Sequence, residues 1–120
     1  MTRVSRQQGV TILELGPSYD SLDDSSLEEF GGALLDEAAH AEPPRLILDL
    51  SHTSYIGSSF LELLVRAWKR IRGRGGAMAL CGVQPFCVEV LQITRLDSLW
   101  TIYPTRSEAV AAVARFVASG

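Results

Sequence analysis

The strongest constraint on the fold is a pair of short apolar segments separated by a helix-like pattern. The segments are residues 45–50 and 77–81, and each consists mostly of apolar residues. Apolar runs of this length are typical of central strands in a parallel sheet, because both faces of such strands are covered. Between the two segments, apolar residues recur at helical spacing, as Leu61, Leu64, Val65, Trp68 and Ile71. This order predicts a strand, a crossover helix and a second, parallel strand.

The rest of the chain continues the alternation of strands and helices. Expected strands cover residues 3–7, 9–15 and 99–103, and expected helices cover 26–40, 85–96 and 107–118. Pro43 and Pro44 end the first helix, and Pro85 suits the first turn of a later one. We therefore expect one α/β domain over residues 1–120, with a four- to five-stranded, mostly parallel sheet packed with about four helices. Its expected core contains Leu46, Ile47, Leu48, Leu64, Val65, Leu80 and Leu91.

Composition and net charge exclude several classes of protein. Hydrophobic residues make up 47% and charged residues 21% of the 120 residues, which is ordinary for a globular domain. No apolar run approaches the roughly 20 residues of a membrane-spanning helix, and the N-terminal segment lacks the apolar stretch of a secretory signal. We therefore expect a cytoplasmic protein in which Cys81 and Cys87 are reduced core thiols. The net charge of −3 argues against nucleic acid as the main partner.

Charged residues are unevenly distributed along the sequence. No Lys or Arg occurs between Gln7 and Pro44, whereas this segment holds many acidic residues, Asp20 and Asp23 among them. The following segment carries the basic residues Arg66, Lys69, Arg70, Arg72 and Arg74. Such segregation can steer a charged protein partner toward the domain. The alternative for each cluster is a solvated helix face without a partner.

The segment 49–62 carries the best candidate for a functional site, at the junction of a strand and a helix. In it, Gly57 precedes Ser58 and Ser59 at the expected start of the helix. Glycine adopts tight-turn backbone angles that other residues resist, and a serine at a helix start exposes its hydroxyl beside free backbone N–H groups. A phosphate on that hydroxyl would be stabilised, because helix N-termini attract anions. The simpler interpretation is that one of the serines is only an N-cap, worth about 1 kcal/mol.

An ordered series of motifs over residues 9–117 resembles the STAS family, named for sulfate transporters and anti-sigma-factor antagonists. The family places an Asp-Ser-Ser/Thr-Gly-Leu motif between a central strand and an amphipathic helix. The matching residues are Gly57, Ser58, Ser59, Phe60 and Leu61, after a strand that ends in Leu48, Asp49, Leu50 and Ser51. Further matches are Gly75 and Gly76 before a strand, Pro85 and Leu96 at the ends of a helix, Ile102, and Glu108 with Ala109 in the last helix. The resemblance implies a STAS-like fold.

The resemblance also implies a regulatory, protein-binding function. In phosphorylatable members, the serine after the motif's Asp is phosphorylated by a partner that is both anti-sigma factor and serine kinase. The unphosphorylated antagonist binds this partner, and phosphorylation blocks binding. The matching serine is Ser58, with Ser59 as the less favoured acceptor, and a serine phosphatase fits as a further partner. The implied partner surface consists of Gly57, Ser58, Ser59, Phe60, Glu62, Asp20 and Asp23.

Two positions depart from the family motif. Gly57 replaces its acidic residue, and Phe60 replaces its glycine and places a large ring where the family keeps the surface small. We therefore expect Phe60 to border the partner surface, so that Phe60→Gly alters affinity more than stability. These departures keep a second function open. In it, the domain is a subunit or scaffold of a lipid-transporting ATP-binding-cassette system or another bacterial complex and is not phosphorylated.

The sequence contains no pattern that indicates an enzyme, a cofactor or a metal site. Residues 57–60 do not match the G-x-S-x-G elbow of an α/β-hydrolase, and residues 73–77 lack the Gly-Lys-Ser/Thr ending of a phosphate loop. His40 and His52 are the only histidines, and together with the two cysteines they lack zinc-ligand spacing. We therefore expect a non-enzymatic domain without cofactor or metal.

Overall fold

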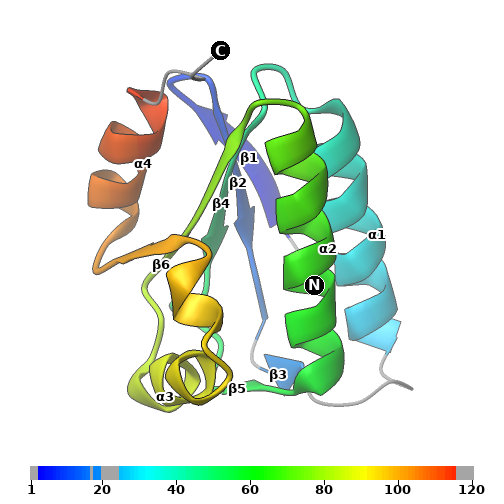
Figure 1. Cartoon of the computed structure of the whole chain (residues 1–120), viewed down its shortest axis with the longest axis vertical. Helices are drawn as coiled ribbons and strands as arrows, with labels where there is room; N and C mark the ends of the chain where they lie inside the picture. Colours follow the sequence, from blue (N-terminus) through cyan, green and yellow to red (C-terminus); the bar gives the residue numbers. More distant parts are fainter. Residues whose placement is uncertain (1–2, 17, 20–24, 116–120) are drawn as a thin grey trace.

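The computed structural model describes residues 3–16, 18–19 and 25–115, and Figure 1 shows how helices cover the two faces of its sheet. The strands are β1 (Arg3–Gln7), β2 (Val10–Glu14), β3 (Ser18–Tyr19), β4 (Arg45–Asp49), β5 (Tyr55–Ile56), β6 (Ala77–Cys81) and β7 (Thr101–Tyr103). The helices are α1 (Ser25–His40), α2 (Ser58–Gly73), α3 (Pro85–Ile93) and α4 (Arg106–Ala114), with a 3₁₀ helix η1 (Leu96–Ser98).

The main sheet has five strands in the order β1-β2-β4-β6-β7. Neighbouring strands in this sheet are parallel, except that β1 pairs antiparallel with β2. The two apolar segments are the central strands β4 and β6, which lie in register with Leu48 opposite Leu80. The expectation of a mostly parallel, four- to five-stranded sheet in an α/β domain is confirmed.

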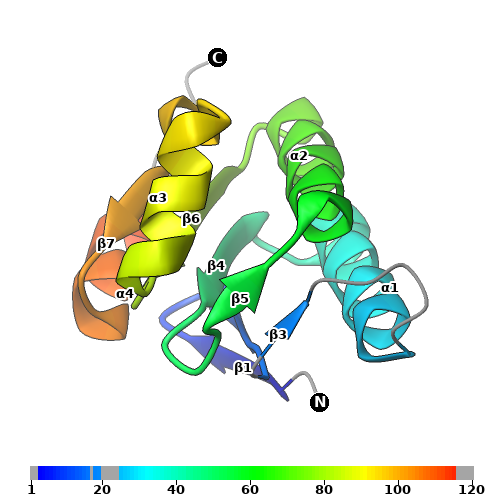
Figure 2. The same ribbon diagram turned by 90° about the horizontal axis from the view of Figure 1, so that it is seen from below.

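Helices α1 and α2 cover one face of the sheet and α4 covers the other (Figure 1). Successive residues of a strand point to opposite faces. Leu48 accordingly belongs to the larger core under α1 and α2, and Ile47 to the smaller core under α4. At the end of the sheet where β4 ends lie β3, β5 and α3 (Figure 2), so this end is built from short elements and loops.

The expected core residues are buried, except for Val65, which is partly buried and packs against the others. Cys81 and Cys87 are buried and form no disulfide, as expected. Burial raises the pKa of Cys81 to about 12 and also raises the pKa of Cys87. Both thiols therefore stay protonated near neutral pH and act as small apolar core groups.

The C-terminal third differs from the expected boundaries. Helix α3 ends at Ile93 instead of residue 96, because Arg95 adopts a left-handed backbone (φ 62°) that starts η1. Strand β7 begins at Thr101 instead of residue 99. Helix α4 begins at Arg106, where the Thr105 hydroxyl accepts the Glu108 N–H at 3.2 Å as an N-cap. The expected continuation over residues 116–118 lies outside the described residues.

Candidate functional site

Ser58 is the first residue of α2 and is exposed, whereas Ser59 is half-buried. Gly57 occupies the N-cap position, and no side chain forms a capping hydrogen bond there. The simpler interpretation, in which one of the serines is only an N-cap, is therefore wrong. The Leu61 N–H donates a helical hydrogen bond to the Gly57 carbonyl at 3.1 Å. The backbone N–H groups of Ser58 and Ser59 come earlier in the chain, in the first turn, where a helix offers its N–H groups no carbonyl acceptor of its own. This helix end is polarised positively, without a side chain that caps it.

Gly57 has an extended backbone, with φ −113° and ψ −177°. Any residue adopts these angles, so the expected tight turn that requires glycine does not occur at this position. The acidic residue of the family motif would fit the same backbone. The departure at Gly57 thus removes a carboxylate without altering the local chain path.

Phe60 lies in the core, with 0% of its surface exposed. Its ring stacks on Phe30 of α1 with centroids 5.2 Å apart and an interplanar angle of 15°. The expectation that Phe60 borders the partner surface is therefore wrong. The ring fills the space between α1 and α2 and leaves Ser58 accessible.

The chain that leads to Ser58 is anchored by Thr53, which is fully buried. The Thr53 hydroxyl donates to the carbonyl of Gly16 at 2.8 Å, and its N–H donates to the Leu50 carbonyl at 3.0 Å. From the other side, the Cys87 thiol of α3 lies 3.7 Å from the Thr53 carbonyl. The chain then forms β5, which pairs parallel with β3 and is followed directly by α2. Ser58 is therefore held by the ends of several elements.

A partly buried ion pair lies at the same end of the sheet. Asp49, at the end of β4, accepts the Ser51 N–H at 2.9 Å and the Arg106 Nε–H at 2.9 Å. Arg106 Nη2 also lies 2.7 Å from Asp49 and 3.2 Å from Glu14. Burial opposes ionisation of Asp49, but the hydrogen bonds from Ser51 and Arg106 outweigh it and hold the pKa of Asp49 below its ordinary value. The pair joins β4 to the start of α4.

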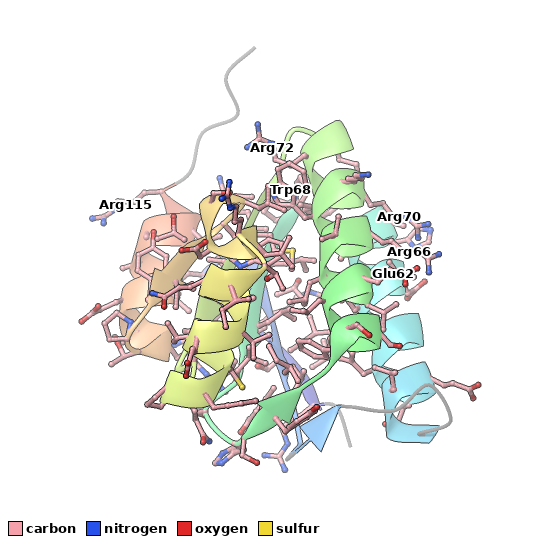
Figure 3. The ribbon with its side chains drawn as sticks, turned by 60° about the horizontal axis from the view of Figure 1, so that its bottom comes forward. Glu62, Arg66, Trp68, Arg70, Arg72 and Arg115 are labelled. Atoms are coloured by element: carbon pink, nitrogen blue, oxygen red, sulfur yellow. The ribbon has the colours of Figure 1, made fainter. Side chains whose placement is uncertain are left out.

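Two surface features flank the start of α2. On one side, a groove of about 320 Å³ runs between α1 and α2, and its lining includes Ser59, Glu62 and Arg66. Figure 3 shows Glu62, Arg66 and Arg70 following one another along the outer side of α2. The second feature is the stack of Tyr55 on Phe86, with ring centroids 5.6 Å apart. Tyr55 is 42% exposed and Phe86 is 48% exposed.

The predicted partner residues are thus only partly brought together. Gly57, Ser58, Ser59 and Glu62 share the first turns of α2, and Phe60 leaves the set because it is buried. Asp20 and Asp23 lie outside the described residues.

The aromatic pair was missed by sequence reasoning. Tyr55 stands three residues before Ser58, but Phe86 comes from a helix nearly thirty residues later. Only the folded chain brings the two rings together. The one available signal was the position of Phe86 next to Pro85 in the first turn of α3.

Each histidine lies beside a carboxylate. His52 Nε2 lies 3.3 Å from Glu14, and His40 Nδ1 lies 3.2 Å from Asp36 at the far end of α1. Among the described residues, no group of three or more His, Cys, Asp or Glu side chains is arranged to hold a metal ion. Within the same residues, no helix is both long and apolar enough to cross a membrane.

The fold and the exposed serine at the start of α2 can be compared with known protein families. Residues 2–109 match the STAS domain family. This match covers most of the chain, so the protein belongs to the STAS domain family.

Relatives within this family carry names that describe anti-sigma-factor antagonists. The chain is similar to a STAS domain protein from Planctomyces limnophilus described as an anti-sigma-factor antagonist, with 37% identity, a TM-score of 0.83 and coverage of 94% and 97% of the two chains. It is 32% identical over 68 residues to the putative anti-sigma factor antagonist BtrV of Bordetella bronchiseptica, a match that spans 57% of this chain and 59% of that protein.

A third likeness concerns the fold alone. The phosphorylated form of SpoIIAA, a cell fate determinant from Bacillus, shares the fold with a TM-score of 0.70 at 16% identity, over 94% and 99% of the two chains. The family match and the likeness to the Planctomyces limnophilus protein make the chain a STAS domain similar to anti-sigma-factor antagonists.

Proposed function

We propose that this domain is an anti-sigma-factor antagonist controlled by phosphorylation of Ser58. In the unphosphorylated state it binds an anti-sigma factor that is also a serine kinase, and this binding releases a sigma factor. Phosphate on Ser58 weakens the complex, and a serine phosphatase restores it. The function would place the domain in the cytoplasm, as a substrate of the kinase and not as a catalyst. The observation that carries the proposal is the exposed Ser58 at the uncapped start of α2.

Ser58 is a better acceptor than its neighbour for a geometric reason. A kinase must reach the hydroxyl with the γ-phosphate of ATP, and Ser58 is exposed whereas Ser59 is half-buried. Ser59 also lines the groove between α1 and α2, beside Glu62. The proposal therefore assigns the phosphate to Ser58 and a contact role to Ser59.

The phosphate acts on the interface and not on the fold. At the first position of α2, it meets the positive end of the helix dipole and the backbone N–H groups of the first turn. The first turn contains no acidic residue that would repel it. A partner that covers this helix end must instead remove water from about two negative charges, or bring its own negative charges close to them, and both weaken the complex. Each tenfold loss of affinity needs only about 1.4 kcal/mol, so one phosphate is sufficient for a switch.

Tyr55 and Phe86 extend the proposed partner surface beyond the serines. The two stacked rings are partly exposed. Tyrosine and phenylalanine are enriched at protein interfaces, and tyrosine is also enriched at the positions that contribute most to binding. Because β5 leads directly into α2, a partner that covers Ser58 is positioned to cover Tyr55 as well. Tyr55→Ala is therefore expected to weaken the complex more than a change at Glu62 on the rim.

The experiment that tests the proposal is phosphorylation followed by peptide mapping. The domain is incubated with ATP and the serine-kinase anti-sigma factor from the same organism, and the modified residue is located by mass spectrometry. Ser58→Ala and Ser59→Ala form a matched pair. The proposal predicts phosphate on Ser58 in the wild type and in Ser59→Ala, and loss of phosphate in Ser58→Ala.

Phosphate on another residue, or none with an active kinase that binds the domain, would refute the switch. In that case the unmodified scaffold or transporter subunit becomes the better account.

A further inference from the structure

The groove between α1 and α2 lies on the side of the two helices that faces away from the sheet. Figure 1 shows α1 and α2 side by side and running in the same direction, both starting at the end of the molecule where α2 begins with Ser58. The groove has a volume of about 320 Å³, and its apolar lining consists of Leu27 and Leu63. Leu27 is buried and Leu63 is half-buried. An apolar strip is thus left accessible between the two helices.

Two successive glycines of α1, Gly31 and Gly32, line this groove. Glycine in the interior of a helix makes the helix less stable than alanine does. Packing within the domain accounts for Gly31, because a Cβ there would lie 3.1 Å from Leu63 Cδ1. It does not account for Gly32, which is exposed and where a Cβ would meet no described atom within 4 Å. A helix that packs on the groove from outside accounts for Gly32, since a residue without a side chain lets another backbone approach closely.

Charged residues of both signs line the groove in order along the helices. Glu28 and Glu62 lie near the starts of α1 and α2, and Arg66 lies one turn beyond Glu62. Figure 3 shows Glu62 and Arg66 following one another on the outer side of α2. In the part of the chain that the structure describes, none of these three side chains forms an ion pair. The groove therefore has an acidic end and a basic end, and both are available to a partner.

We propose that this groove is the contact surface of a homodimer, in which a second copy of the chain packs across it with its helices antiparallel. In a two-fold dimer, every contact between two different residues occurs twice. A two-fold axis halfway between Glu62 and Arg66 places Glu62 of each copy opposite Arg66 of the other. The antiparallel arrangement also brings the positive helix starts of one copy toward the negative helix ends of the other. One surface that carries both complementary charges favours a second copy over an unrelated protein.

The size of the surface indicates a weak dimer. Each helix has 16 residues. Two such helices, each about 24 Å long and roughly 10 Å wide, present a face of about 500 Å². Interfaces of stable complexes bury about 800 Å² on each partner, whereas transient ones are smaller. We therefore expect a Kd of about 10–100 µM at low salt, and a higher Kd at high salt because exposed ion pairs are screened.

Sedimentation velocity of the purified domain, from about 5 to 500 µM, spans the expected Kd and should show a change from monomer to dimer. Glu62→Arg and Arg66→Glu each place like charges opposite one another and should raise the Kd at least about tenfold. An equimolar mixture of these two variants should recover the wild-type Kd within about threefold, because each changed residue then meets an opposite charge. Glu89→Arg makes the same charge change on an exposed residue of α3 and should dimerise like the wild type.

Gly32→Gln tests the close approach of the second copy. Glutamine forms helix better than glycine does, so the variant should melt a few degrees above the wild type and yet dimerise at least about tenfold more weakly. A folding defect cannot produce this combination. Gly73→Gln is the matched control, because Gly73 is exposed and a Cβ there meets no described atom within 4 Å. The control should dimerise like the wild type.

The inference is overturned if the domain remains monomeric at about 1 mM in low salt, well above the expected Kd. A mixture of Glu62→Arg and Arg66→Glu that associates no better than either variant alone also overturns it. So does a monomeric domain whose binding to the anti-sigma factor is weakened by Gly32→Gln, which would assign the groove to that partner. Self-association is measured on the domain alone, without kinase or ATP. Failure of this inference is therefore distinguishable from failure of the proposed switch.

Discussion

Phe60 lies two residues after Ser58 in the sequence, but its side chain is not part of the surface around Ser58. Its ring is fully buried and stacked on Phe30, so it links α1 to α2. Large aromatic side chains contribute strongly to core stability, and aromatic pairs add to the effect of burial. A glycine at this position, as in the family motif, would leave a void that other core residues would have to fill.

Phe60→Ala is therefore expected to lower the free energy of unfolding by about 3–5 kcal/mol, and the milder Phe60→Leu by about 1 kcal/mol. Urea denaturation followed by circular dichroism measures both changes. The milder variant should leave partner binding close to that of the wild type. An unchanged urea midpoint in Phe60→Ala would place the ring outside the core and contradict the structure.

The ionised carboxylate of Asp49 stabilises the fold at the end of the sheet that carries Ser58. Its carboxylate is held by Ser51 and Arg106, and its folded pKa lies below the ordinary value of 3.8. A group with a lowered pKa stabilises the fold above its unfolded pKa, and this contribution is lost as the pH falls through its folded pKa.

Asp49→Asn should lower the free energy of unfolding by about 1–3 kcal/mol at pH 7, because it removes a charged hydrogen-bond acceptor from Arg106. The difference between wild type and variant should stay constant down to about pH 5 and shrink below about pH 4. Urea unfolding at several pH values measures it. The control Asp97→Asn, at an exposed residue of η1, should change stability by less than about 0.5 kcal/mol. A stability difference that grows as the pH falls would disprove the assigned role of Asp49.

At the scale of the elements, the junction between α2 and β6 depends on a close approach at Gly76. A Cβ at this position would lie 2.0 Å from the backbone oxygen of Pro44. That oxygen also accepts the Ala77 N–H at 3.0 Å, which fixes the start of β6 beside β4. Neither group can move without opening the sheet.

Gly76→Ala should accordingly lower the free energy of unfolding by at least about 2 kcal/mol. Gly73→Ala is the matched control, because a Cβ there meets nothing within 4 Å. At the last residue of α2, alanine should be neutral or stabilising by up to about 1 kcal/mol. Thermal unfolding of the two variants makes the comparison, and equal melting temperatures would contradict the close approach.

The elements also show what sequence could and could not predict. β4 and β6 were predictable, because the consecutive apolar residues at the centre of β4 and along β6 must be covered on both faces. The inward position of Phe60 was predictable too, since Phe60, Leu64, Ala67 and Ile71 recur at helical spacing. The family motif has a glycine at this position, and comparison with it led to the wrong prediction that Phe60 lies at the surface. The short β7 was not predictable, because the left-handed turn at Arg95 and η1 determine where it begins.

In the whole molecule, the two ends of α2 carry different features. The exposed serine, the partly buried ion pair of Asp49 and the aromatic stack lie at the end where β4 ends. A cavity lined in part by Trp100 lies at the other end of α2. The core between them is continuous, so a charge added at Ser58 should change the surface and leave the fold intact.

The most direct test of the central claim is the affinity of the domain for its serine-kinase anti-sigma factor before and after phosphorylation. Isothermal titration of the wild type, phosphorylated wild type, Ser58→Asp and Ser58→Ala measures it. We predict at least about tenfold weaker binding of the phosphorylated protein and of Ser58→Asp, a loss of about 1.4 kcal/mol or more. Ser58→Ala should bind like the wild type, and all melting temperatures should agree within a few degrees. Equal affinity of the phosphorylated and unphosphorylated proteins would contradict the account.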